Sequence, residues 1–229
     1  MRADAILFDK DGTLFDFQKT WAPWLAQIIG ALGAGDPRRE AALAEAWDFD
    51  RATGTIQPQS IVIASEVSEL CEVILPLVPD HDQESLLQYL LETSALAEAV
   101  EVVALPPFLN ALACDGLALG IATNDAESVA RAQLRRVGAE GLFDFIAGYD
   151  SGHGAKPGPG MCLAFAAHTG LEASRIVMVG DSAHDMEAGR AAGMQTLAVL
   201  TGVAGHDDLA GLADAVLPDI SHLPAWLAG

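Results

Sequence analysis

The sequence predicts an α/β fold, and two observations carry this prediction. From about residue 105 onward, short apolar runs typical of buried strands alternate with stretches of helical periodicity. Between residues 17 and 100, in contrast, glycines are scarce and apolar residues recur at helical spacing. Together they indicate a Rossmann-like parallel sheet with helices on both faces, into which an all-helical block is inserted after the first strand.

The predicted core begins with the apolar run at residues 5–8, which stops at Asp9 and is followed by a turn signal. Five further runs are expected to be strands, at residues 117–122, 145–147, 176–179, 196–200 and 215–217. The last of these is expected at the edge of the sheet. Helices are predicted at residues 126–137, 160–168, 185–192 and 223–227.

The block between residues 17 and 100 carries four helical stripes of apolar residues. The first includes Trp21 and Trp24, which we expect to pack inside the block, and the third runs from Ile61 through Ala64 to Ile74. The predicted organisation is therefore an α/β core formed by residues 1–16 and 101–229, with a helical cap at residues 17–100.

The charge balance excludes several classes of protein. Acidic residues outnumber basic ones 32 to 12, for a net charge of −20, which disfavours binding to nucleic acids or to membrane surfaces.

Cys71, Cys114 and Cys162 show no zinc-binding spacing and are expected to be free thiols in a reducing compartment. Because no signal peptide or membrane span is apparent, we expect a cytoplasmic protein. Nothing in the sequence predicts an oligomeric state.

Polar side chains follow several of the predicted strands. Asp9 and Asp11 follow the first strand, Thr123 and Asn124 follow the second, and Lys156 lies in the loop after the third. Asp181 follows the fourth strand, and Asp185 comes four residues later. Because parallel sheets form their binding crevice at the carboxyl ends of the strands, these groups are expected to meet there. Each alone has an ordinary explanation as a turn or helix cap, but together they indicate a site.

The combination of these motifs resembles the haloacid dehalogenase superfamily of phosphohydrolases, and within it the phosphoglycolate phosphatase group. The resemblance covers the whole chain and includes a helical cap after the first motif. Its motifs are Asp9-Lys10-Asp11-Gly12-Thr13-Leu14, Thr123-Asn124, Lys156-Pro157 and Gly180-Asp181-Ser182-Ala183-His184-Asp185.

The resemblance implies a role for each residue of the first motif. Asp9 would attack phosphorus to form an aspartyl phosphate, which divides hydrolysis into two easier steps. Asp11 would protonate the leaving oxygen and then activate the attacking water as a base. Thr13 would hold Asp11 by a hydrogen bond.

The later motifs would bind the phosphoryl group and a metal ion. Thr123 and the backbone amide of Asn124 would hold the phosphoryl oxygens, and Lys156 would neutralise the nucleophile and the transferring group. Asp181 would bind Mg²⁺ together with Asp9 and the Asp11 carbonyl. Asp185 would orient Lys156 or a water molecule from behind.

A charge count supports the metal. The carboxylates of Asp9, Asp11, Asp181 and Asp185 sum to −4 when all are ionised, and Lys156 reduces this to −3. A phosphate dianion would not approach such a site. Mg²⁺ reduces the charge to −1 and protonation of Asp11 reduces it to zero, so we expect Mg²⁺ as cofactor and a small phosphorylated metabolite as substrate.

Alternatives remain open at this point. A sugar-phosphate mutase of the same superfamily (β-phosphoglucomutase type) would keep the same motifs, and a non-catalytic binding module would keep only the fold. His184 is expected to be incidental. For a phosphoglycolate-like substrate, a cation must face the carboxylate, and Arg51, at the end of a helical run before a loop, is the expected contact when the cap closes.

Overall fold

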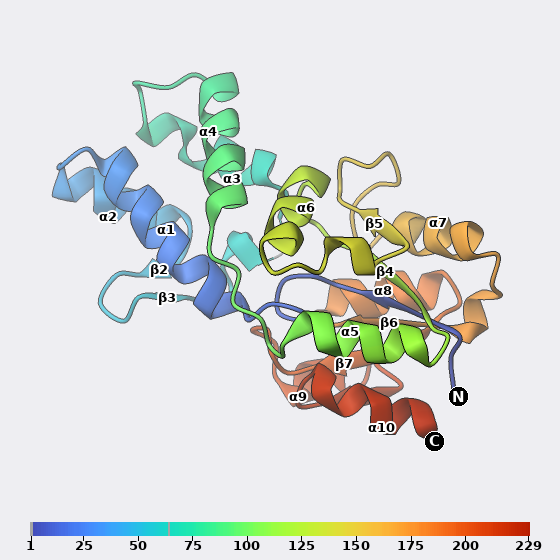
Figure 1. Cartoon of the computed structure of the whole chain (residues 1–229). Helices are drawn as coiled ribbons and strands as arrows, with labels where there is room; N and C mark the ends of the chain where they lie inside the picture. Colours follow the sequence, from blue (N-terminus) through green and yellow to red (C-terminus); the bar gives the residue numbers. More distant parts are fainter. Residues whose placement is uncertain (1, 64) are drawn as a thin grey trace.

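The computed structural model describes residues 2–63 and 65–229, so Ala64 of the predicted third stripe lies outside the described residues. Figure 1 shows two parts, an α/β core that carries both chain ends and a mainly helical block beside it. The block is formed by the segment that follows β1 in the chain. The fold class expected from the sequence is therefore confirmed.

The core is built on a six-stranded sheet in the order β5-β4-β1-β6-β7-β8, and every neighbouring pair is parallel. If only the six strands of this sheet are numbered in chain order, the arrangement is the Rossmann order 3-2-1-4-5-6. Successive strands are first added on one side of β1 and then, from β6 onward, on its other side. As predicted, the last strand lies at one edge. The strands are β1 (Ala5–Phe8), β4 (Ala118–Ala122), β5 (Phe145–Ala147), β6 (Ile176–Gly180), β7 (Gln195–Val199) and β8 (Ala215–Leu217).

Helices cover both faces of the sheet because alternate side chains of each strand point to opposite sides. Ile6 and Phe8 of β1 pack in one apolar cluster with residues of α5, α6 and α10, whereas Leu7 packs with α7 and α8 in another. The core helices are α5 (Leu105–Cys114), α6 (Glu127–Arg136), α7 (Gly160–Thr169), α8 (Ala183–Ala191), α9 (His206–Leu209) and α10 (Leu223–Ala228). Short 3₁₀ turns are η3 (Glu140–Leu142), η4 (Ala173–Arg175) and η5 (Ile220–His222).

Two core helices, α5 and α9, were absent from the sequence expectation. Helix α5 begins at Leu105 and has prolines in its first turn, where a missing backbone N–H costs nothing. Two consecutive prolines, here Pro106 and Pro107, usually indicate a break in a helix, so the sequence pattern did not predict a helix at this position. Helix α9 spans only four residues, too few for a periodic pattern.

The inserted block is not helical throughout, which corrects the all-helical expectation. A two-stranded ribbon joins β2 (Phe49–Asp50) to β3 (Thr55–Ile56). The carboxylate of Asp50 accepts from the backbone N–H groups of Ala52 and Thr53, and Gly54 has a φ of +69°, so the chain turns sharply here. The other elements are α1 (Phe17–Gly33), α2 (Pro37–Ala46), η1 (Ile61–Ile63), α3 (Val67–Ile74), η2 (Leu75–Leu77) and α4 (Gln83–Leu96).

The block, called the cap below, has an apolar core of its own that includes Trp21, Trp24 and Trp47. The two segments that connect the cap to the sheet lie side by side, and the N–H of Asp16 in one donates to the carbonyl of Val100 in the other. The boundaries at residues 16/17 and 100/101 stay a proposal. Within residues 2–63 and 65–229, none of the helices combines the length and apolar character needed to cross a bilayer.

Candidate active site

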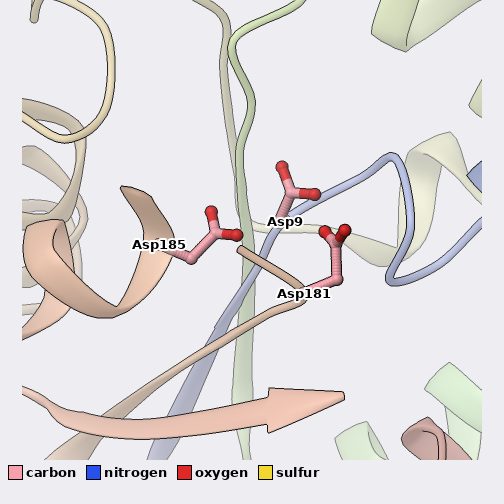
Figure 2. Close-up of side chains that lie close together, drawn as sticks. All are labelled: Asp9, Asp181 and Asp185. Atoms are coloured by element: carbon pink, nitrogen blue, oxygen red, sulfur yellow. The ribbon is translucent and has the colours of Figure 1, made fainter. Parts of the chain in front are cut away.

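The polar residues at the carboxyl ends of three adjacent strands converge on one point. Asp9 directly follows β1, Thr123 directly follows β4, and Asp181 directly follows β6. Since β1 pairs with both β4 and β6, their ends lie next to each other. The strand order reverses at β1, and sheets of this kind form their binding crevice at the carboxyl ends of the strands around that point. Figure 2 shows the carboxylates of Asp9 and Asp181 side by side, with Asp185 facing them.

Lys156 is the cation at the centre of this group. Its Nζ lies 2.6 Å from Oδ1 of Asp9 and 2.6 Å from Oδ1 of Asp185, and all three side chains are buried. Burial alone lowers the pKa of a lysine, but the carboxylates of Asp185 and Asp9 outweigh it and raise the pKa of Lys156 above its ordinary value. Lys156 is therefore a permanent positive charge beside Asp9.

Asp185 is held in place from the opposite side. Its Oδ2 accepts from the hydroxyl of Ser182 at 2.6 Å and from the Ser182 backbone N–H at 3.1 Å, in a capping box that begins α8. The Oδ1 atom is thereby left to Lys156. In this structure, Asp185 thus orients the lysine rather than facing solvent.

Asn124 fixes the loop that carries Lys156. Its Nδ2 donates to the backbone carbonyl of Lys156 at 2.9 Å, and its Oδ1 accepts from the Lys156 N–H at 2.8 Å. This double contact is a side-chain role that the sequence analysis did not anticipate. Thr123, also buried, accepts from the N–H of Asp125 through its hydroxyl at 3.1 Å.

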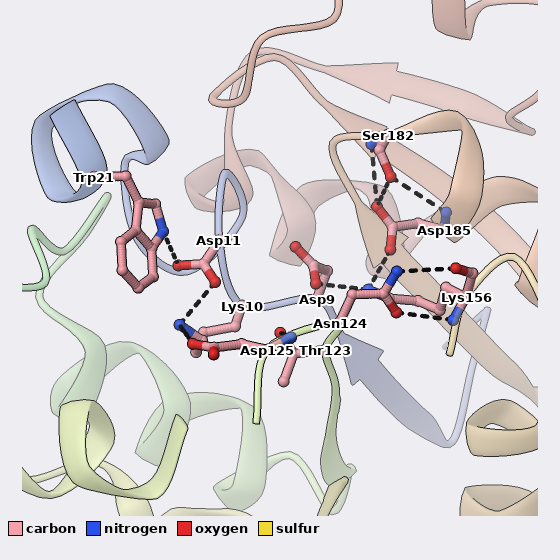
Figure 3. Close-up of polar contacts among 10 residues, drawn as sticks. All are labelled: Asp9, Lys10, Asp11, Trp21, Thr123, Asn124, Asp125, Lys156, Ser182 and Asp185. Carbon is pink, nitrogen blue, oxygen red and sulfur yellow. Dashed lines mark hydrogen bonds and ion pairs between the residues drawn. The ribbon is translucent and has the colours of Figure 1, made fainter. Parts of the chain in front are cut away.

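Asp11 is held by two donors, one from the cap and one from the core (Figure 3). The indole Nε1–H of Trp21 on α1 donates to Oδ1 at 2.8 Å, and the Nζ of Lys10 lies 2.7 Å from Oδ2. The expectation that Thr13 holds Asp11 is wrong in this structure. The Thr13 hydroxyl is buried without a hydrogen-bond partner, and the contacts of the Asp11 carboxylate come from Trp21 and Lys10.

Lys10 is a buried cation beside the site to which the sequence analysis assigned no role. Its fully buried Nζ also lies 3.0 Å from Oδ2 of Asp125 and 2.5 Å from Oε1 of Gln133 on α6. It sits 5.2 Å from the centre of the Trp21 ring. Lys10 stands in the sequence between Asp9 and Asp11, directly after an acidic residue that follows a fully apolar run, so a lysine here predicts acidic partners. That was the available signal.

The acidic cluster fits a divalent cation. Asp9, Asp181 and Asp185 each offer a carboxylate oxygen, and these oxygens lie within 4.8 Å of one another. Burial raises the pKa of Asp9 to about 7, against the opposing effect of Lys156, and burial with the charges of Asp9 and Asp185 raises the pKa of Asp181. A cation beside these groups would relieve the repulsion between them.

The backbone around Asp181 is shaped for its carboxylate. A Cβ at Gly12 or at Gly202 would overlap the Asp181 side chain, and Gly12 also has a φ of +81°. Both glycines therefore leave space for a carboxylate at the centre of the site. Asp181 and Asp9 fit the expected metal ligands, whereas Asp185 is committed to Lys156 and Ser182.

A cavity lies between this cluster and the cap. Its floor is formed by the site residues already described, including Asp9, Asp11 and Lys156, and His184 at the start of α8 borders it. Its opposite wall comes from the cap: Phe17, Trp21 and Trp24 line it from α1. The two tryptophans thus pack in the cap core, as expected, and also face the cavity.

Most of the remaining cap residues that line the cavity are aliphatic. Val62 and Ile63 of η1 and Val67 and Leu70 of α3 line the cavity. Its remaining polar side chains on the cap side are the hydroxyls of Ser65 and Ser94. The cap residues that line the cavity are together called the cap wall: Phe17, Trp21, Trp24, Val62, Ile63, Ser65, Val67, Leu70 and Ser94.

Arg51 does not reach this cavity, which corrects the expected substrate contact. Its guanidinium pairs with the carboxylate of Glu40 on α2, and its side chain is 44% exposed. It borders a separate hollow together with Phe49 and Gly54. Glu40 borders the same hollow, and its carboxylate holds the arginine there.

Residues 6–199 match the family of haloacid dehalogenase-like hydrolases. The chain belongs to this family, and it is an enzyme of the hydrolase class. A phosphoglycolate phosphatase from Xylella fastidiosa is 32% identical over 206 residues, which cover 89% of this chain and 82% of that protein. The resemblance inferred from the motifs is therefore confirmed.

Solved structures show the same fold. A predicted phosphoglycolate phosphatase from Haemophilus somnus superposes with a TM-score of 0.74 at 18% identity, over 99% of both chains. A Thermotoga maritima protein provisionally identified as a β-phosphoglucomutase superposes with a TM-score of 0.69 at 19% identity, over 98% of both chains. At these identities, the similarity concerns the architecture alone.

Proposed function

We propose that the chain is a Mg²⁺-dependent phosphatase that hydrolyses a small phosphomonoester through an aspartyl phosphate on Asp9. The observation that carries the proposal is the buried contact of 2.6 Å between Lys156 Nζ and Asp9 Oδ1, at the floor of a cavity that Asp11 also lines. A nucleophile, a fixed cation and an acid thus face one space. The names of the curated relatives, phosphoglycolate phosphatases among them, support the same activity.

The first step follows from the charges around Asp9. Its Oδ1 is bound to Lys156, so its other oxygen is the one free to attack phosphorus. Lys156 offsets the negative charge that gathers as the carboxylate and the phosphoryl group approach each other. Thr123 lines the same space, and its hydroxyl would hold a phosphoryl oxygen together with the Asn124 backbone amide.

Asp11 is the proposed general acid for the leaving oxygen. Its Oδ1 faces Trp21 on the cap and its Oδ2 faces Lys10, so its position is fixed relative to both parts of the protein. As the acid, it would protonate the leaving alkoxide; as the base, it would then take a proton from the water that attacks the aspartyl phosphate. Mg²⁺, held by Asp9, Asp181 and the Asp11 carbonyl, would supply charge neutralisation for the phosphate dianion.

The cap wall favours a phosphatase over the mutase alternative. A mutase that starts from a sugar bisphosphate must hold a second phosphate at the far side of the cavity. Among the described residues, the cap wall offers no basic side chain for such a group. Retention of Asp9, Asp11, Lys156 and Asp181 argues against a non-catalytic binding module.

The decisive test is phosphate release by wild type and by Asp9→Asn. We expect Mg²⁺-dependent release from small phosphomonoesters, and a loss of at least about 1,000-fold in the variant, because an amide does not attack phosphorus. Asp115→Asn, which removes an exposed carboxylate at the end of α5, is the matched control and should keep full activity. Circular dichroism should show both variants folded. Activity of Asp9→Asn within tenfold of wild type would contradict the mechanism.

Metal removal is a second test. Exhaustive chelation should abolish phosphate release, Mg²⁺ should restore it, and excess Ca²⁺ should inhibit it, because Ca²⁺ prefers a larger and looser shell of oxygens. The measurement is phosphate release against the concentration of each ion. Full activity in the chelated protein would refute the assignment of a metal to Asp9, Asp181 and the Asp11 carbonyl.

A further inference from the structure

The side chains of the cap wall would contact the leaving group of the substrate, so their chemistry indicates which leaving groups fit. The surface of the wall comes from aromatic side chains of α1 and aliphatic side chains of η1 and α3. Of the side chains that line the cavity in the described parts of the chain, Lys156 is the one lysine or arginine, and it is bound to Asp9 and Asp185. The phosphoryl group would take the remaining capacity of Lys156.

The basic residues of the cap lie elsewhere. Within residues 17–100 the sequence holds four, Lys19, Arg38, Arg39 and Arg51, and none of them lines the cavity. Lys19 pairs with Asp16, Arg39 pairs with Asp80, and Arg51 pairs with Glu40. Lys10 is fully buried, and Asp11, Asp125 and Gln133 surround its ammonium group. No cation of the cap is therefore positioned to meet an anionic leaving group.

The floor of the cavity makes a second anionic group still less favourable. The carboxylates of Asp9, Asp11, Asp125, Asp181 and Asp185 all line it. Lys156 and one Mg²⁺ are needed there to admit the phosphate itself. A carboxylate on the leaving group would lie between this acidic floor and an apolar wall, where it would lose water without gaining a counter-ion.

The polar atoms of the cap wall are uncharged. Ser65 and Ser94 contribute hydroxyls, and the buried indole N–H of Trp24 has no hydrogen-bond partner in the described structure. Such groups suit neutral oxygens, for example a hydroxyl or an amide carbonyl. Trp21 and Phe17 offer flat apolar surface to a ring or chain beside them.

We infer that the preferred substrate is a phosphomonoester whose leaving group is uncharged and presents an apolar surface, rather than one that carries a carboxylate or a second phosphate. The inference rests on the proposed phosphatase function and specifies its substrate class. Among the described residues that line this cavity, no lysine or arginine other than Lys156 is available to the carboxylate of phosphoglycolate, the substrate in the names of several relatives. The discriminating feature is the charge of the leaving group, not its size.

The test compares phosphoglycolate with phosphoglycolamide, which has the same size and lacks the carboxylate charge. With Mg²⁺ present, wild type should show a kcat/KM for the amide that is about tenfold or more above that for the acid, because an unpaired charge disfavours binding. The same order should appear in calorimetric titrations of the Asp9→Asn variant, which reports binding without turnover.

A cation added to the cap wall should reverse the preference. Val62→Lys places an ammonium group on the wall at a half-buried position, and we expect the ratio of acid to amide kcat/KM to rise by about tenfold. Val73→Lys is the matched control, since Val73 is 43% exposed on α3 and lies outside the cavity lining. Its ratio should equal that of wild type.

The outcomes separate this inference from the proposed function. A wild-type preference for phosphoglycolate, or an unchanged ratio in Val62→Lys, would overturn the inference and leave the phosphatase proposal intact. A lack of phosphate release from both compounds and from phenyl phosphate would overturn the phosphatase proposal. In that case the calorimetric comparison decides the inference alone, and tighter binding of phosphoglycolate would overturn it.

Discussion

Asp11 differs from the other carboxylates of the site in the source of its contacts. Asp9 and Asp185 are bound by Lys156, from the core, whereas Asp11 is bound by Trp21 of the cap and by Lys10 of its own motif. In the proposed mechanism the leaving group extends toward the cap, so a residue at the junction of the two parts is placed to act on it. Asp9 is more buried than Asp11, and in the proposed mechanism it attacks the phosphorus.

This arrangement predicts that Asp11→Asn depends on the leaving group. An alkyl phosphate, whose oxygen must be protonated on departure, should lose about 100- to 10,000-fold in kcat/KM. A 4-nitrophenyl phosphate, whose oxygen departs as a stable anion, should lose far less in the phosphoryl-transfer step. Pre-steady-state measurement of nitrophenol release isolates that step. Equal losses for both substrates would show that Asp11 is not the general acid.

At the scale of elements, the loops after the strands set the shape of the site. The loop after β1 carries Gly12, and the loop after β7 carries Gly202, and both approach the carboxylate of Asp181. The Thr201 hydroxyl donates to the Gly12 carbonyl at 2.6 Å, which ties the two loops together. Asp181 is therefore enclosed by backbone from two different strand ends.

Gly202→Ala should weaken metal binding, because the added methyl group overlaps the Asp181 carboxylate and displaces it. We expect the Mg²⁺ concentration for half-maximal activity to rise by about 10- to 100-fold, as for changes that misplace a ligand. Gly211→Ala, where a Cβ meets open space, is the control and should match wild type. A Gly202→Ala variant with the wild-type Mg²⁺ requirement would contradict the placement of the metal at Asp181.

At the scale of the whole molecule, the apolar interiors of the cap and of the α/β core bury two of the three free cysteines. Cys71 lies in the cap core and Cys162 in the sheet core, whereas Cys114 is exposed at the end of α5. Burial raises the pKa of Cys71, and it raises the pKa of Cys162 to about 12 despite the opposing charge of Lys156. Both buried thiols are therefore protonated and shielded at neutral pH.

A thiol titration at pH 8 should accordingly resolve the cysteines. Ellman's reagent should modify Cys114 rapidly in the native protein, and it should reach Cys71 and Cys162 only after unfolding in denaturant. Cys114→Ser should remove the rapid phase. Rapid modification of a second thiol in native Cys114→Ser would mean that one of the two cores opens under native conditions.

The sequence by itself determined the class of fold and the chemistry at the strand ends. Apolar runs of strand length indicated where the sheet lies, and parallel strands end at one edge, so Asp9, Thr123 and Asp181 were expected to meet there. The strand limits agree within two residues because burial on both faces requires continuous apolar runs. The cytoplasmic location stays a prediction.

Only the tertiary structure decided how these residues are held and what faces them. The partners of Lys10, the contact between Trp21 and Asp11, and the pairing of Arg51 with Glu40 join side chains from different elements. Periodicity along the chain specifies which side of an element is apolar, but not which side chain of another element lies opposite. That depends on how the cap packs over the sheet, and this packing gives the cavity an acidic floor and an apolar wall.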